Sequence, residues 1–171
     1  MVLDNMNDIM DSMFNKNSGK LLLALSKLDK ELSITVMGTS MEPVLKDGDV
    51  IKVKPCNNYE IGDIIVFLYK NNALLVHRLI KKRNKILLCK GDNSFRLEEV
   101  EEEYVLGKVI SINSNHIYTI PNELIELSYL VNREFRKNRY EIDKTKNSPV
   151  YISFRNKLCS YIQEKQKSDL K

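Results

Sequence analysis

The most informative stretch of the sequence reads Gly38-Thr39-Ser40-Met41-Glu42-Pro43-Val44-Leu45 and continues to Asp47-Gly48-Asp49. A glycine lets the chain turn sharply, so Gly38 can expose the hydroxyl of Ser40 at the end of a strand. Met41 is apolar beside a polar serine, and we expect it to point into the core and lock the turn. Backbone N–H groups of such a turn can form an anion-binding hollow, to which Thr39 adds a hydroxyl. Because a serine is unreactive near neutral pH without an adjacent base, Ser40 is a candidate nucleophile that needs a partner.

Alternating or apolar segments on both sides of this turn predict short strands. We expect strands over residues 33–37, 49–54, 63–69, 73–80, 86–89, 104–113 and 117–120. The run 63–69 is nearly continuous in apolar residues, which is typical of a strand buried on both faces. Asn71-Asn72 and Ser114-Asn115 mark turns between neighbouring strands. Together these segments predict a compact, mostly antiparallel β unit.

Helical spacing of apolar residues is found before and after the β unit. We expect helices over residues 2–14 and 20–32, a helix capped by Asn122, a linker over 144–149 and a final helix over 152–165. The predicted fold class is therefore mainly β with helices at both ends, α+β overall. Its expected parts are an N-terminal helical segment 1–32, a β domain 33–120 and a C-terminal helical extension 121–171.

Composition and charge limit the classes of partner. The chain has 171 residues and a formal net charge of +4, and this surplus falls in the C-terminal third, where it is mixed with acids. We therefore expect no nucleic acid partner. Apolar runs fall short of the about 20 residues that span a bilayer, and the acidic N-terminus lacks the basic start of a secretory signal. The Met and Leu stripes before residue 33 predict core packing, with peripheral contact to a membrane as the alternative.

Cysteines and histidines give no sign of a metal site or a cofactor. Cys56, Cys89 and Cys159 are odd in number and widely spaced, which fits free thiols in a reducing compartment, and so a cytoplasmic protein. His77 and His116 lie far apart and have no metal-ligand spacing with the cysteines. We expect neither a metal nor a cofactor.

Four sequence boxes occur in the order found in one family. The first surrounds Ser40, and the others read Gly62-Asp63-Ile64-Ile65-Val66-Phe67, Leu75-Val76-His77-Arg78-Leu79-Ile80 and Lys90-Gly91-Asp92-Asn93. Over about residues 36–120 the chain resembles the S24/S26 peptidase superfamily, which holds type I signal peptidases and LexA-type proteins. The resemblance implies a compact β peptidase fold, with Ser40 as nucleophile and His77 as base. Histidine at this position resembles the His-type branch, and it needs less pKa tuning than lysine would.

The third residue of the site is left open by the sequence. A histidine base usually has a partner that holds its tautomer, and the best candidate is Asp92, which follows a strand after the hairpin from His77. An aspartate slightly further on often serves in His-type relatives, and here Glu98 and Glu99 stand at that place. Asp92 would otherwise hold its loop by accepting backbone N–H bonds. Lys90 is an alternative base, but it lies two residues before Asp92, which indicates a surface ion pair between them.

The oxyanion donors also depart from the family pattern. Many signal peptidases carry a hydroxyl residue two positions before the nucleophile, where this chain has Gly38. The backbone N–H of Ser40 would then be the main donor, with the Thr39 hydroxyl as a second. Since losing one donor costs about 100- to 1000-fold in rate, the pattern predicts a slow enzyme.

The resemblance implies a serine endopeptidase, and the lack of a long apolar run predicts that it works without a membrane anchor. Its substrate would be a precursor or leader peptide, bound extended and with small residues near the cut. One alternative is a catalytically weak or inactive peptide-binding module of the same fold. A LexA-like self-cleaving repressor is less favoured, because neither an Ala-Gly nor a Cys-Gly dipeptide occurs and about 32 residues are short for a helix-turn-helix domain.

Overall fold

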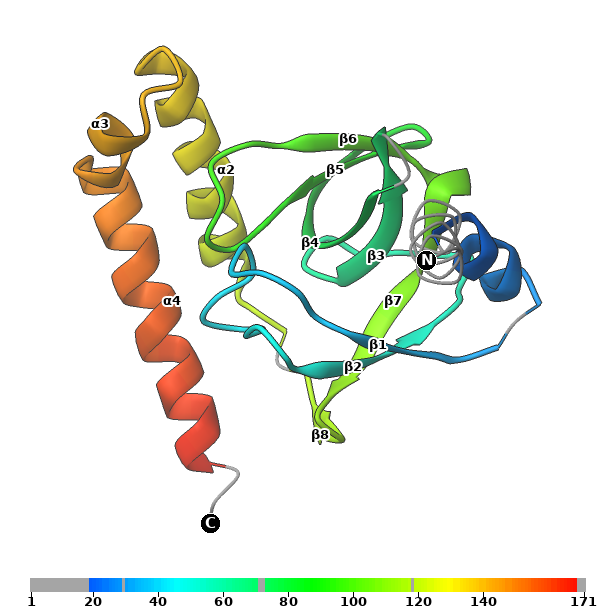
Figure 1. The fold of residues 1–171 in the computed structure, drawn as a ribbon. Helices are drawn as coiled ribbons and strands as arrows, with labels where there is room; N and C mark the ends of the chain where they lie inside the picture. The colour runs from blue at the N-terminus through cyan, green and yellow to red at the C-terminus, as the bar shows by residue number, and fades with distance from the viewer. Residues whose placement is uncertain (1–18, 29, 71–72, 118, 169–171) are drawn as a thin grey trace, which may run out of the picture.

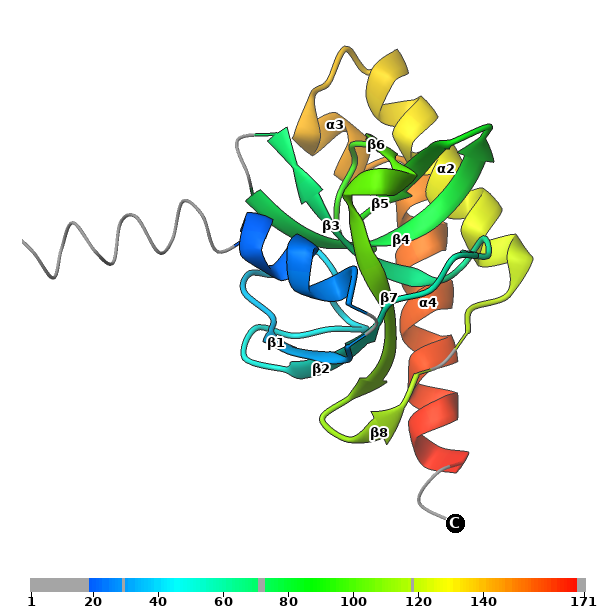
Figure 2. The same ribbon diagram turned by 90° about the vertical axis from the view of Figure 1, so that its right-hand side faces the viewer.

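The computed structural model describes residues 19–28, 30–70, 73–117 and 119–168, and Figures 1 and 2 show it from two sides. A short helix over residues 19–26 comes first. The later elements are β1 (Leu32–Thr35), β2 (Val50–Lys54), β3 (Ile64–Tyr69), β4 (Ala73–Arg83), β5 (Ile86–Lys90), β6 (Glu98–Glu101), the 3-10 helix η2 (Glu102–Tyr104), β7 (Val105–Ile112), β8 (Asn115–His116), α2 (Asn122–Lys137), α3 (Ile142–Lys146) and α4 (Pro149–Ser168).

In the part of the chain that the structure describes, the strands form one antiparallel sheet. Its order is β1-β2-β7-β3-β4-β5-β6, with β8 paired to β7. Register shifts in β2, β3 and β4 mark bulges, which bend strands and increase their twist. The sheet therefore curls, as Figure 1 shows. This confirms the expected fold class, a mainly β antiparallel unit with flanking helices.

Strand β3 runs through the middle of the core and is buried on both faces. Ile64, Val66 and Leu68 join one apolar cluster, whereas Ile65 and Phe67 join a second cluster on the opposite face. Because successive side chains of a strand alternate between faces, a nearly continuous apolar run is what such a strand requires. The prediction of a doubly buried strand over residues 63–69 is confirmed.

The C-terminal helices share a third apolar cluster with the sheet. Val131 of α2 and both Phe154 and Leu158 of α4 are fully buried there, together with Ile80 of β4. Figure 2 shows α4 running beside the sheet over much of its height. The helices are thus anchored to β4, the strand that also carries His77. Among the described residues, no helix combines the length and apolar character that a membrane crossing requires.

Several expected boundaries differ from the structure. The helix expected over residues 20–32 ends at residue 26, and Leu32 instead begins β1, where it pairs with Val53. The last hairpin turns at Asn113 and Ser114, whose φ values of 47° and 68° are left-handed. Strand β8 therefore covers Asn115–His116, just before the strand that was expected over residues 117–120. The helix expected over residues 2–14 lies outside the described residues.

Other differences concern elements for which the sequence pattern gave no clear signal. No strand was expected over the acidic stretch that begins at Glu98, yet it forms β6 with Val100 buried on its inner side. The expected linker over residues 144–149 contains the end of α3 and the start of α4 at Pro149. Asn122 lies within α2, whose N-cap is Pro121 and has no side-chain cap bond. Short or charged elements of this kind give little periodic signal.

Candidate functional site

The turn between β1 and β2 presents the hydroxyl of Ser40 to solvent. Gly38 has a φ of 89°, a left-handed value that suits glycine, and its N–H donates to Asp47 Oδ1 at 2.7 Å. Met41 is buried in the apolar cluster beneath the turn. Ser40 itself is exposed, so the turn buries its apolar neighbour and leaves the hydroxyl accessible.

The loop that follows β5 holds this turn from a second side. The N–H of Asn93 donates to the Ser40 carbonyl at 2.7 Å, and Asn93 Nδ2 donates to the Thr39 carbonyl at 3.1 Å. Gly91 leaves no room for a side chain, because a Cβ atom there would lie 2.5 Å from the Ser40 carbonyl oxygen and 3.0 Å from His77 Nε2. Sequence reasoning gave Gly91 and Asn93 no role, although both belong to the last sequence box.

His77 projects from β4 toward the turn. It pairs with Ile65 across the sheet and is buried, with its ring edge-on to Phe67 at a centroid separation of 6.2 Å. Its Nε2 atom lies 3.1 Å from Ser40 Oγ. The structure therefore brings together the two residues on which the sequence argument rested.

Glu98, at the start of β6, contacts the other side of the imidazole. Its Oε2 atom lies 2.9 Å from His77 Nδ1, and the two side chains are only 13% and 6% exposed. A carboxylate accepts a hydrogen bond at this separation, which favours the tautomer with its hydrogen on Nδ1 and leaves Nε2 as the acceptor for the Ser40 hydroxyl. Glu98 is placed there because β6 pairs with β5 so that Glu98 lies opposite Cys89.

Asp92, the preferred third residue in the sequence analysis, does not contact His77. Its two oxygens accept bonds from Arg78 Nε at 2.9 Å and Arg78 Nη2 at 2.7 Å, and both side chains are fully buried. The remaining Arg78 nitrogen, Nη1, donates to the Gly62 carbonyl at 2.9 Å. A buried guanidinium requires a counter-charge, and Asp92 supplies it. The expectation for Asp92 is corrected on this ground, and the alternative of capping backbone N–H groups does not describe it either.

The other two acid–base expectations also find a definite place. Glu99 follows Glu98 on β6 and is exposed, since neighbouring residues of a strand point to opposite faces. Lys90 was expected in a surface ion pair with Asp92, but it is fully buried and its Nζ donates to the Gly91 carbonyl at 3.0 Å and to Ser128 Oγ at 3.1 Å. Burial lowers the pKa of Lys90 from 10.5 to about 8, against the opposing effect of the nearby carboxylates.

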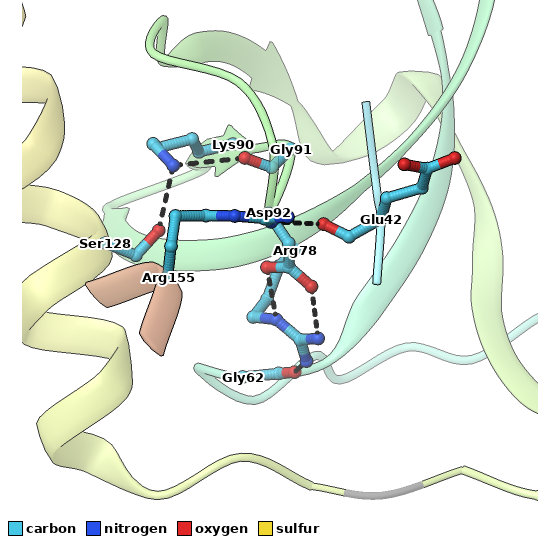
Figure 3. A network of polar contacts seen from close by, with 8 residues as sticks. All are labelled: Glu42, Gly62, Arg78, Lys90, Gly91, Asp92, Ser128 and Arg155. Carbon is cyan, nitrogen blue, oxygen red and sulfur yellow. Dashed lines mark hydrogen bonds and ion pairs between the residues drawn. The ribbon is translucent and has the colours of Figure 1, made fainter. Parts of the chain in front are cut away.

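Figure 3 shows how the C-terminal helices reach this centre. From α2, Ser128 accepts the bond of Lys90, which in turn holds the Gly91 carbonyl. From α4, Arg155 Nη1 donates to the Glu42 carbonyl at 2.6 Å, two residues after Ser40. The backbone on both sides of the Ser40 hydroxyl is therefore supported from helices far away in the sequence. Nothing in the one-dimensional pattern indicated these contacts.

Other reactive groups give no second centre in the part of the chain described. The three cysteines are free, and burial raises the pKa of the Cys89 thiol, which disfavours the nucleophilic thiolate. Within the described ranges, no three His, Cys, Asp or Glu side chains are placed to hold a metal ion together. The arrangement with a chemical capability is thus the exposed hydroxyl of Ser40, hydrogen-bonded to a buried imidazole that contacts a carboxylate.

Comparison with known proteins identifies relatives of this chain. A LexA repressor of Geobacillus sp. (strain WCH70) is 32% identical over 89 residues, which are 52% of this chain and 43% of the repressor. A LexA repressor of Shouchella clausii (strain KSM-K16) is 30% identical over 89 residues, with the same shares of the two chains. A third, from Leuconostoc mesenteroides, is 30% identical over 96 residues, or 55% of this chain and 45% of the repressor. The chain thus spans less than half the length of these relatives.

A family model covers a larger part of the chain. The model described as Peptidase S24-like matches residues 8–110, which include β1 to β6 and most of β7. Ser40, His77 and Glu98 all lie inside the matched region, whereas α2 and α4 lie outside it. On the extent of this match, the chain belongs to the Peptidase S24-like family.

Proposed function

We propose that this protein is a serine endopeptidase in which Ser40 is the nucleophile, His77 the general base and Glu98 the residue that orients His77. One observation carries the proposal: Ser40 Oγ lies 3.1 Å from His77 Nε2 while Glu98 Oε2 lies 2.9 Å from His77 Nδ1. A nucleophile, a base and an orienting carboxylate within hydrogen-bond reach of one another are the parts that acyl transfer requires.

In the proposed reaction, His77 Nε2 takes the proton of the Ser40 hydroxyl as its oxygen attacks the scissile carbonyl. The imidazolium that forms donates from Nδ1 to Glu98, whose negative charge stabilises it in a mostly buried setting. His77 then gives its proton to the leaving amine, and a water molecule hydrolyses the ester on Ser40 by the reverse sequence.

The developing oxyanion would be bound by the turn itself. Among the described residues, the backbone N–H of Ser40 has no acceptor, whereas the N–H of Gly38 is already bound to Asp47. The Ser40 N–H is therefore a free backbone donor at the nucleophile, and the Thr39 hydroxyl is the second donor in the proposal. With Gly38 in place of a hydroxyl residue, we expect slow turnover.

The proposed substrate is an extended segment of a precursor or leader peptide with small residues near the cut. The sheet ends in two edge strands: β1, which comes just before Ser40, and β6, which carries Glu98. An extended peptide can add to such an edge by main-chain hydrogen bonds, which places its carbonyl groups in register with the site. We propose that this encounter takes place in the cytoplasm, where the three free thiols would persist.

A peptide-library cleavage assay read by mass spectrometry tests the proposal directly. Ser40→Ala and His77→Ala are each expected to abolish cleavage while the circular dichroism spectrum and the unfolding midpoint stay close to wild type. The chain offers matched controls in Ser160→Ala and His116→Ala, since both side chains are exposed and lie outside the contacts described for the site. Cleavage that persists in either Ser40→Ala or His77→Ala would contradict the mechanism, and absence of cleavage in wild type would favour an inactive peptide-binding module.

The likeness to LexA repressors favours a second candidate, in which the same three residues cut a peptide bond of this chain itself. Cleavage within one molecule follows first-order kinetics, with a rate that does not change with protein concentration, whereas cleavage of a separate chain accelerates with it. Incubation of the protein alone over a hundredfold range of concentration separates the two. A Ser40→Ala chain that is cut by added wild type would favour action on separate chains.

A further inference from the structure

An arginine-rich hollow lies away from the Ser40 turn, between the sheet and the C-terminal helices. It encloses about 600 Å³ and is lined by Arg83 at the end of β4, by Arg96 in the loop before β6, and by Arg133 and Arg136 of α2. Helix α2 lies beside the β4–β6 end of the sheet in Figure 1, which is how three separate segments come to share one wall. The proposed peptidase mechanism uses none of the residues that line this hollow. Helix α2, which forms one of its walls, lies outside the family match.

The four guanidinium groups have no ion-pair partner in the part of the chain that the structure describes. None of them takes part in an ion pair or in a side-chain hydrogen bond there, in contrast to the buried pair of Arg78 and Asp92. The acidic side chain that lines the hollow is Glu99, so its lining carries a formal charge of +3. Like charges gathered in one concave site raise the local potential and attract anions.

The lining also indicates which anion fits. A guanidinium offers a planar fork of N–H donors that matches a phosphate group in two parallel bonds. Tyr129 and Tyr140 add aromatic rings and hydroxyls, and Lys81 Nζ lies 5.4 Å from the centroid of the Tyr129 ring, which extends the positive charge. The volume is within the range of small-molecule sites rather than of an extended polymer groove.

We propose that this hollow binds a small molecule that carries two or more phosphate groups. The guanidinium groups contact the phosphates, and the tyrosine rings are available to a base or other flat group attached to them. Glu99 opposes such a ligand, so the affinity is tuned downward by one carboxylate. The proposal does not depend on peptide hydrolysis, because the residues that carry it do not contact Ser40 or His77.

Isothermal titration calorimetry on the full chain tests this site with ATP, pyrophosphate, citrate and a single-stranded oligonucleotide as probes. ATP and pyrophosphate are both expected to bind, because each carries two or more phosphate groups. Arg133→Gln with Arg136→Gln is expected to weaken binding more than about tenfold, since both variants lose charge-assisted hydrogen bonds to phosphate. Glu99→Gln is expected to tighten binding by several-fold, which a merely structural role of the hollow does not predict.

The matched control is Lys144→Gln with Lys157→Gln, which removes two charges from exposed ion pairs outside the hollow. It should leave binding within about twofold, because exposed charges at a distance are screened by salt. Arg96→Gln, in a loop, repeats the test if the helix variants unfold. The proposal is overturned if neither phosphate probe binds at millimolar concentration, if citrate or a single-stranded oligonucleotide binds more tightly than both, or if the control pair weakens binding as much as the arginine pair.

Discussion

Replacing Glu98 by Gln tests whether Glu98, rather than Asp92 or Glu99, is the residue that orients His77. The substitution keeps the shape of the side chain and removes its charge from a position 2.9 Å from His77 Nδ1, where the pair is mostly shielded from water. Opposite unit charges about 4 Å apart at an effective dielectric constant of about 20 attract by about 4 kcal/mol. If Glu98 supplies this energy to the imidazolium of the transition state, its loss slows the reaction by about 10³-fold.

The assay is steady-state cleavage of a peptide found in the library experiment, together with urea unfolding of each variant. For Glu98→Gln we expect kcat to fall by about 10³-fold with KM little changed, because the charge acts on a cation that exists only during the reaction. For Asp92→Asn we expect the opposite pattern, a loss of about 3–5 kcal/mol of unfolding free energy, because Arg78 is left buried without its counter-charge. Glu99→Gln, one residue away and exposed, should change neither quantity.

Two results would refute this division of roles. One is a kcat of Glu98→Gln within about twofold of wild type, which is far below the loss that the charge interaction predicts. The other is an Asp92→Asn protein that unfolds like wild type but has lost its activity, which would return the orienting role to Asp92.

Three further predictions concern the supports of the site. Gly91→Ala should lower kcat by about 100-fold, because its Cβ would lie 2.5 Å from a carbonyl oxygen of the turn. As a control, Gly107→Ala in β7, whose Cβ would meet the Lys54 carbonyl, should lower stability and leave kcat unchanged. Equal kcat losses in the two variants would contradict this. The pKa of Lys90 is lowered from 10.5 to about 8, so the folded state holds fewer protons between these values and the stability of wild type relative to Lys90→Met should rise by about 3 kcal/mol from pH 8 to pH 10.5 in urea unfolding. A flat difference would show that Lys90 keeps its ordinary pKa. Arg155→Met should lower kcat by about tenfold or more, because α4 then loses its hydrogen bond to the turn; full activity at unchanged stability would show that the bond does not position the site.

The sequence was sufficient for the parts of the fold that have a strong local signal. The Ser40 turn, the doubly buried run of β3 and the position of His77 on a strand each depend on residue types close together in the chain. Binary patterning fixes which face of a strand is buried, and therefore which side chains can meet across neighbouring strands. The pairing of Ser40 with His77 was implied by the family resemblance that the order of the boxes carries.

The contact partners of the acids could not be predicted in the same way. Whether Asp92 or Glu98 reaches His77 is decided by the register of β6 on β5 and by the need of Arg78 for a counter-charge. A single acidic stretch from Glu98 onward looks like a solvated face, because one buried Val100 is too little to reveal a strand. Arg78 offered the one usable signal, since an arginine within an apolar strand must find a carboxylate.

The hydrogen bond between Arg155 and the Glu42 carbonyl has a consequence for the timing of biosynthesis. A ribosome makes Ser40, His77 and Glu98 well before it reaches α4, and at roughly 5–20 residues per second the interval is several seconds. During that interval the nascent polypeptide already carries the three reacting groups but lacks the clamp that α4 provides. Under the proposed mechanism, full hydrolytic activity would therefore begin only after translation has passed Arg155 and α4 has docked.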